Sequence, residues 1–375
     1  MTWEQWLSVL ALATSMVAVL LALGARRAVG TRPGATRPTR PWGTFGPALD
    51  APGRGTGADR DTSQLVAFVA NPTKSGVPEF REAAFHACAT RYLPEPLWLE
   101  TTETDPGVGQ AKEAIEKGAQ IIVAVGGDGT VRAVAEGLVG TGIPMALIPM
   151  GTGNLLARNL DLPLSDQEDL LRIALTGHDE TIDVGWLTVE RPDGSTDDGE
   201  HLFLVIAGLG FDAQMVAGAD EQLKKRLGWL AYFLASVKHL HDRRLRVRVT
   251  ADGGPPESMR LRTVLIGNCG RLPGGITLLP DAVLDDGWLD LAAIDTRGGL
   301  VGWGQLLADV LLQGIGVRAK LPARIGRIDH SRVRAVEIQA LQGEEFQIDG
   351  EGFGQATAVT ARVDPGVLVV RVAPR

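Results

Sequence analysis

The stretch that most constrains the fold is residues 121–130, which read IIVAVGGDGT. Five consecutive apolar residues, most of them β-branched, predict a short strand that is buried on both faces. Glycines follow at once, and residues 131–139 have the pattern of a helix. A glycine turn between a strand and a helix lets the backbone approach a phosphate, because no Cβ blocks the way and the first helical N–H groups are unpaired. An ordinary tight turn is the alternative, and the carboxylate of Asp128 within the turn favours a functional loop.

Length, charge and cysteine content narrow the class of protein. The 375 residues are enough for two domains with a substantial core. A net charge of −8 argues against a general nucleic-acid-binding protein, which would normally be basic. The two cysteines, Cys88 and Cys269, are far apart and lack CxxC spacing, so the sequence indicates neither a disulfide framework nor a zinc site.

The N-terminal segment differs from the rest of the chain. Residues 6–23 are almost wholly apolar, and this is about the length that crosses a bilayer. Arg26 and Arg27 follow the apolar run instead of preceding it, which disfavours a signal peptide, and the lack of a polar face disfavours a core helix. We therefore expect a transmembrane anchor at residues 1–24 with its C-terminal side in the cytoplasm. Residues 25–63 are rich in Arg, Pro and Gly and predict a disordered linker.

From residue 64 to about residue 180, apolar runs of strand type alternate with helical patterns. This alternation predicts an α/β domain with a parallel sheet, in which ligands bind at the carboxyl ends of the strands. Four strand-to-loop junctions with small or hydroxyl-bearing residues would meet at that edge: residues 71–76, 101–102, 126–130 and 151–154.

After residue 181 the pattern changes to short strands separated by polar, Gly or Pro turns. Residues 181–375 therefore predict a mainly antiparallel β-sandwich domain. Helical patterns interrupt it at about residues 219–240 and 300–312. The second helix has few charges, which suits core packing or, alternatively, a wall for an apolar substrate.

No GxxxxGK[ST] motif occurs, so the chain is not a P-loop enzyme. Taken together and in order, seven short motifs resemble the diacylglycerol kinase/lipid kinase family, whose bacterial members and sphingosine kinases share one plan. These are NPTKSG (71–76), TTE (101–103), GGDGT (126–130), PMGTGN (149–154), GLGFDA (208–213), PDAVLDDGWLD (280–290) and DGE (349–351). Each motif is weak alone, and the set is specific.

The resemblance implies a kinase with ATP as phosphoryl donor and Mg²⁺ as cofactor. The residues that would contact the nucleotide are Asn71, Pro72, Thr73, Ser75, Thr102, Gly127, Asp128, Gly129, Thr130 and Thr152. Glu351 would be the general base that accepts the proton of the lipid hydroxyl. A structural Mg²⁺ would be held by the Asp286 carboxylate and the backbone carbonyls of Val283 and Trp288.

Physical chemistry agrees with this assignment. Phosphoryl transfer needs neutralisation of phosphate charge and a base near the acceptor, and aspartates flanked by glycines offer oxygen ligands suited to Mg²⁺. A plain hairpin turn is the alternative for the sequence around Asp286. We expect Asp128 to be an exposed loop carboxylate that contributes little to the core. One departure is notable: the family usually has Asn-Glu where this chain has Arg132 and Ala133.

The sequence thus predicts an ATP-dependent lipid kinase of phospholipid metabolism, with diacylglycerol converted to phosphatidic acid as the leading reaction. The alternatives are an NAD kinase-like enzyme, which shares GGDGT, and a membrane-tethered nucleotide-binding protein without turnover. The expected location is the plasma membrane, with a single span and cytoplasmic catalytic domains. The expected partners are the lipid substrate, ATP and the inner membrane surface, but no nucleic acid; a homodimer is left open.

Overall fold

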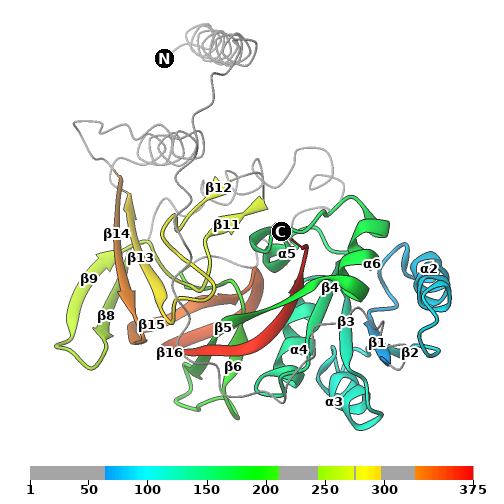
Figure 1. Cartoon of the computed structure of the whole chain (residues 1–375). Helices are drawn as coiled ribbons and strands as arrows, with labels where there is room; N and C mark the ends of the chain where they lie inside the picture. The colour runs from blue at the N-terminus through cyan, green and yellow to red at the C-terminus, as the bar shows by residue number, and fades with distance from the viewer. Residues whose placement is uncertain (1–63, 211–243, 274–275, 297–325, 375) are drawn as a thin grey trace, which may run out of the picture. The chain divides into compact units, whose positions relative to one another are not determined.

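The computed structural model describes residues 64–210, 244–273, 276–296 and 326–374 (Figure 1). The expected anchor (1–24), the linker (25–63) and the helical patterns at 219–240 and 300–312 lie outside the described residues.

The first part of the described chain, which we call the α/β half, alternates strands and helices as expected. Figure 1 shows α3 and α4 on one face of its strands and α2 and α6 on the other, as right-handed crossovers require. Its elements are β1 (Val66–Ala70), α2 (Val77–Thr90), β2 (Leu97–Glu100), α3 (Val108–Glu116), β3 (Ile121–Gly126), α4 (Asp128–Leu138), β4 (Met145–Pro149), α5 (Leu155–Asn159) and α6 (Gln167–Thr176).

The remainder, which we call the β-rich half, is built of strands that pair mostly antiparallel. They are β5 (His178–Glu190), β6 (His201–Phe203), β7 (Ile206–Leu209), β8 (Leu245–Ala251), β9 (Glu257–Leu261), β10 (Thr263–Gly267), β11 (Arg271–Leu272), β12 (Ile276–Thr277), β13 (Leu289–Thr296), β14 (Gly326–Val333), β15 (Ala335–Ile348) and β16 (Glu351–Val372).

One strand joins the two halves. In the described residues the main sheet runs β14-β13-β10-β7-β15-β16-β4-β3-β1-β2, and β16 lies at its centre. The N-terminal part of β16 pairs antiparallel with β15, and its C-terminal part lies parallel to β4, with Val370 opposite Met145. β5 pairs antiparallel with β16 along most of its length. One sheet, joined by backbone hydrogen bonds, therefore runs through both halves, and Figure 1 shows β16 in red between them.

The predicted order, an α/β domain followed by a β-rich one, is confirmed, with two differences in detail. The sheet is mixed and not purely parallel, because β16 adds to the edge of the parallel strands and carries antiparallel β5. α4 begins at Asp128, three residues before the predicted start, so part of the GGDGT motif is the first turn of the helix. The boundary near residue 180 stays a prediction.

The prediction of a single-pass protein of the plasma membrane is contradicted. Among the described residues, no helix is long and apolar enough to cross a bilayer. The apolar run at residues 6–23, on which the prediction rested, lies outside the described residues.

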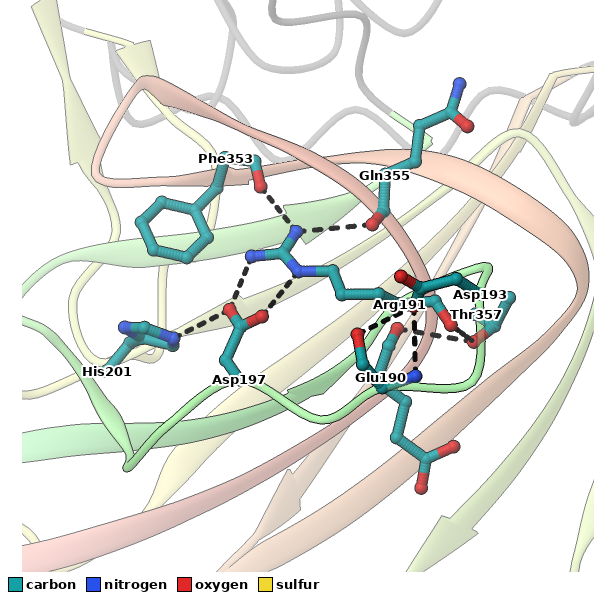
Figure 2. A network of polar contacts seen from close by, with 9 residues as sticks. Glu190, Arg191, Asp193, Asp197, His201, Phe353, Gln355 and Thr357 are labelled. Carbon is teal, nitrogen blue, oxygen red and sulfur yellow. Dashed lines mark hydrogen bonds and ion pairs between the residues drawn. The ribbon is translucent and has the colours of Figure 1, made fainter.

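The long β5–β6 connection is tied to β16 by a polar network around Arg191 (Figure 2). The guanidinium forms a two-pronged ion pair with Asp197 and donates from one nitrogen to the carbonyls of Phe353, at 2.7 Å, and Gln355, at 3.2 Å. His201 Nε2 lies 2.9 Å from Asp197 Oδ2, and its ring meets Phe353 edge to face. Arg191 lowers the pKa of Asp197 below its ordinary value. The network thus fixes the start of β16.

We expect Asp197→Asn to lower the free energy of unfolding by about 1.5–3 kcal/mol at pH 7, because a charged acceptor for Arg191 is lost. A depressed pKa means that the stabilisation is present above the ordinary value of 3.8 and is lost as the pH falls through the lower folded-state value. Urea unfolding at pH 7 and at pH 3 measures both effects. Asp198→Asn, at the exposed neighbouring position, is the control; equal stability of the Asp197→Asn variant and wild type at pH 7 would refute this role.

Candidate active site

The four predicted loops do meet at one edge of the sheet. β2, β1, β3 and β4 are adjacent and parallel, so their carboxyl ends lie side by side. Hydrogen bonds join neighbouring loops: Asn71 N to Val125 O at 2.9 Å, Thr101 N to Ala70 O at 2.9 Å and Met150 N to Gly126 O at 2.7 Å. The fold therefore places the predicted nucleotide contacts from these loops along a single edge.

The glycines of two loops are required by close packing. A Cβ on Gly151 would come within 2.9 Å of the Cα of Gly127, and one on Gly153 within 2.6 Å of Asp128 Oδ2. A Cβ on Gly126 would meet Thr130 at 2.6 Å. Thr130 is 4% exposed, so it packs beneath the loop that was predicted to place it against the nucleotide.

Asp128 links the two glycine loops. Its Oδ2 accepts a hydrogen bond from Asn154 N at 2.9 Å, and its Oδ1 accepts one from Leu155 N at 2.6 Å. Burial raises its pKa to about 6, and the nearby Asp349 and Glu351 carboxylates add to this effect, while the two backbone donors oppose it. The expectation of an exposed carboxylate is therefore corrected: Asp128 is half-buried and holds one loop against the other.

Other predicted contacts lie on the rim of this edge. The Asn71 side chain accepts hydrogen bonds from Thr73 N at 3.0 Å and Thr73 Oγ1 at 2.7 Å, which shapes the loop after β1. Thr102 Oγ1 accepts one from Asp105 N at 3.0 Å. The exposed members of the predicted set are Pro72, Thr73, Ser75, Thr102 and Thr152.

Lys74 is a neighbour of the glycine loop that the sequence analysis did not single out. A Cβ on Gly127 would lie 4.0 Å from Lys74 Nζ, so the ammonium group stands beside the GGDGT backbone. The signal was present in the sequence, because Lys74 lies within NPTKSG, the first strand-to-loop junction. A cation beside a glycine loop suits a bound phosphate.

The turn between β15 and β16 carries Asp349 and Glu351. Ile348 pairs with Glu351, which leaves Asp349 and Gly350 as a two-residue turn with φ of 49° and 84°. Two positive φ values are typical of a type I′ hairpin, and Asp-Gly is a favoured sequence for it.

Asp349 is 4% exposed, and its carboxylate accepts three backbone N–H groups, from Leu204 at 3.0 Å, Val205 at 2.9 Å and Ile206 at 3.0 Å. Burial raises its pKa, while Arg132 and the three N–H donors oppose that rise. Asp349 therefore fixes the turn from within the protein.

Glu351 extends from this turn to the glycine loop of the other half. A Cβ on Gly129 would come within 2.6 Å of Glu351 Oε1, so the carboxylate covers the first turn of α4. Glu351 Oε2 accepts from Arg132 Nη2 at 2.8 Å. The predicted base and the predicted nucleotide loop, which are far apart in the sequence, are thus in contact.

The predicted metal residues lie on a separate loop between β12 and β13. Asp286 Oδ1 accepts from Trp288 N at 3.1 Å, and its Oδ2 lies 3.1 Å from Arg332 Nη2. Burial raises the pKa of Asp286 and of Asp290, whose Oδ2 is buried without a hydrogen-bond partner. One carboxylate with two backbone carbonyls is a hard-oxygen donor set of the kind that Mg²⁺ takes. Among the described residues, however, no three His, Cys, Asp or Glu side chains are grouped so that they could hold a metal ion, and the metal site stays a prediction.

Sequence comparisons agree with this geometry. Residues 66–187 match the model of the diacylglycerol kinase catalytic domain, and residues 205–372 match that of the YegS C-terminal NAD kinase β-sandwich-like domain. A Pseudomonas putida protein named "Probable lipid kinase YegS-like" is 34% identical over 68% of this chain and 78% of its own. The chain belongs to the YegS-like lipid kinase family. The family resemblance drawn from the motifs is confirmed.

Further relatives of this lipid kinase chain cover more of its length. A Pseudomonas aeruginosa protein with the same name is 31% identical over 82% of this chain and 94% of its own. The crystal structure of a diacylglycerol kinase from Bacillus anthracis aligns with a TM-score of 0.59 at 22% identity, over 83% of this chain and 97% of that one. This likeness confirms the fold.

We expect the stability of wild type to decline relative to that of Asp128→Asn as the pH rises from about 4 to 7. The pKa of Asp128 in the folded protein, about 6, lies above its ordinary value of 3.8, so the folded protein binds the carboxyl proton more tightly than the unfolded chain does. The free energy of unfolding of wild type therefore falls as the pH rises between these two values. Denaturant unfolding at several pH values measures this slope, with the exposed Glu116→Gln as control. Parallel curves for wild type and the Asp128→Asn variant would show that Asp128 is not the group responsible.

Proposed function

We propose that the chain transfers the γ-phosphoryl group of ATP to the hydroxyl of a membrane lipid, with diacylglycerol as the substrate and phosphatidic acid as the product. The observation that carries this proposal is the position of Glu351 Oε1 over Gly129, because it puts a carboxylate beside a glycine loop suited to phosphate. The description of the family model that matches residues 66–187 supports diacylglycerol as the acceptor.

The α/β half, residues 64–180, binds the nucleotide in this proposal. Gly127 lets the phosphates approach the backbone at the start of α4, and Lys74 supplies a positive charge beside it. Asp128 keeps the second glycine loop in place, and Thr130 supports the loop from below. The rim residues that remain as direct contacts are Asn71, Pro72, Thr73, Ser75, Thr102 and Thr152.

Glu351 acts as the general base. The lipid hydroxyl oxygen attacks the γ-phosphorus, the bond from that phosphorus to the bridging oxygen breaks, and ADP leaves with the electron pair. Glu351 accepts the hydroxyl proton as the new O–P bond forms. Such a reaction depends mainly on positioning and on neutralisation of the phosphate charge, and a placed base adds the removal of the hydroxyl proton.

The β-rich half, residues 181–375, provides the lipid site and the metal loop. Asp286, with the carbonyls of Val283 and Trp288, would hold a Mg²⁺ that stabilises this loop. A second Mg²⁺, bound together with ATP, would neutralise phosphate charge. Because the acceptor resides in a bilayer, the enzyme works at a membrane surface.

We expect Glu351→Gln to lower kcat for lipid phosphorylation by about 10²–10⁴-fold, because Gln retains the shape and the acceptor for Arg132 but not the basicity. The Kd for ATP should stay within about twofold, because Gln keeps the size of the side chain and an acceptor for the hydrogen bond from Arg132. The assay follows transfer of labelled phosphate from ATP to diacylglycerol in mixed micelles, with ATP binding measured on the same protein. Glu337→Gln on β15 is the matched control. Turnover near that of wild type in a folded Glu351→Gln variant would exclude Glu351 as the base.

We expect Mg²⁺ without nucleotide to raise the melting temperature of wild type and to leave that of Asp286→Asn unchanged, because the variant lacks the only charged ligand of the proposed site. Differential scanning fluorimetry over a Mg²⁺ titration measures the shift, and Asp161→Asn, at an exposed position, is the control. An equal shift in wild type and the Asp286→Asn variant would place the metal elsewhere.

A further inference from the structure

Arg132 departs from the motif that surrounds it and contacts the residue proposed as the base. It lies in α4 four positions after Asp128, and its side chain is 17% exposed. Nη1 donates to the carbonyl of Ile348 at 3.1 Å, and Nη2 donates to Glu351 Oε2 at 2.8 Å. A single guanidinium from the α/β half therefore binds the backbone before the Asp349-Gly350 turn and the side chain directly after it.

The shape of arginine suits this double contact. The guanidinium is a rigid fork with several N–H donors, so it can bind two acceptors at once, and its charge does not depend on pH in the working range. A lysine at this position keeps the charge but lacks the fork. An asparagine is too short to span from the helix to both acceptors.

Two carboxylates of the turn interact with this guanidinium. It binds Glu351 directly, and its positive charge acts against the rise of the pKa of Asp349 that burial causes. The positive charge of Arg132 thus offsets the repulsion between the two negative groups that the turn brings together.

Glu351 depends on such a contact for its position. Its side chain is 51% exposed, and a solvated glutamate samples many rotamers. Arg191 holds the backbone on the far side of the turn through the carbonyls of Phe353 and Gln355, as Figure 2 shows. Arg191 therefore fixes the strand, while Arg132 contacts the carboxylate of Glu351 itself.

We propose that Arg132 is a positioning residue of this kinase: it holds the Glu351 carboxylate over Gly129 and locks the β15–β16 turn to α4. Oε2 is bound to the guanidinium, and Oε1 is left to accept the proton of the lipid hydroxyl. This proposal rests on the proposed function, in which Glu351 is the base. A direct contact of Arg132 with ATP phosphate is the competing role, and the two roles differ in the kinetic parameter that they affect.

The experiment compares Arg132→Met, Arg132→Lys and wild type in full-length protein. We expect kcat for lipid phosphorylation to fall about 10–100-fold in the Met variant, as for a displaced catalytic group, with the KM for ATP within about twofold. The Lys variant should recover part of kcat, because it keeps one charged donor. Arg362→Met is the matched control, since it removes an arginine that pairs with Glu200 on the surface through hydrogen bonds of 2.9 and 2.7 Å.

A double variant distinguishes positioning from a general effect on structure. In a Glu351→Gln background, adding Arg132→Met should lower kcat by less than about twofold, because Arg132 acts through the base that is already lost. Multiplication of the two single effects would overturn the proposal, as would a KM for ATP raised about tenfold with kcat unchanged. Melting temperatures on all variants identify any that fail to fold, and the Lys variant then carries the test.

The same data separate this proposal from the proposed function. Absence of lipid phosphorylation by wild type, with ATP bound, would overturn the proposed function and the positioning role with it. An active wild type that is impaired by Glu351→Gln but not by Arg132→Met would overturn the positioning role alone.

Discussion

The buried carboxylate of Asp349 is the interaction on which the candidate site depends. A charged group that is almost wholly removed from water is tolerated only when its oxygens are satisfied, and here three consecutive backbone N–H groups satisfy them. These donors are the two residues that connect β6 to β7, Leu204 and Val205, and the first residue of β7, Ile206. The Asp349-Gly350 turn is therefore held from inside the β-rich half, and this fixes the direction in which the Glu351 side chain extends.

The position of Glu351 relative to the other half follows from β16. The strand begins at Glu351 among the antiparallel strands and ends beside β4 of the parallel ones. β16 is hydrogen-bonded to β15 on one side and to β5 on the other. The turn that carries Glu351 and the glycine loops therefore belong to the same sheet. Arg132 then adds a side-chain bridge from α4 to the same turn. The two halves are therefore joined by one continuous sheet.

The parts that the sequence predicted well are local. The strand before GGDGT, the glycine turn and the helix follow from residues that are adjacent in the chain, and the alternation up to residue 180 implies that four loops share one edge. The change to a strand-rich region after residue 181 was also predicted, but the 22-residue strand β16 was not. β16 contains Gly352, Gly354 and the Pro365-Gly366 irregularity, which break the alternating pattern on which strand prediction relies.

The contacts that complete the site could not be read from the chain, because they join distant residues. Neither the bridge from Arg132 to Glu351 nor the cradle of Asp349 has a local signature. The roles of Asp128 and Thr130 also depend on the fold. Their residue types indicate a functional loop, but only the structure shows that Asp128 ties two loops together and that Thr130 packs beneath Gly126.

In the proposed reaction, the ATP phosphates lie on residues 126–130 and face Glu351. A crystal structure with Mg²⁺ and a non-hydrolysable ATP analogue would show this arrangement. We expect the γ-phosphate against the backbone of the glycine loop, with the Glu351 carboxylate on its open side and room for one hydroxyl oxygen within hydrogen-bond reach, about 2.6–3.2 Å, of that carboxylate. Phosphates bound away from this loop, or a Glu351 side chain turned away from the γ-phosphate, would contradict it.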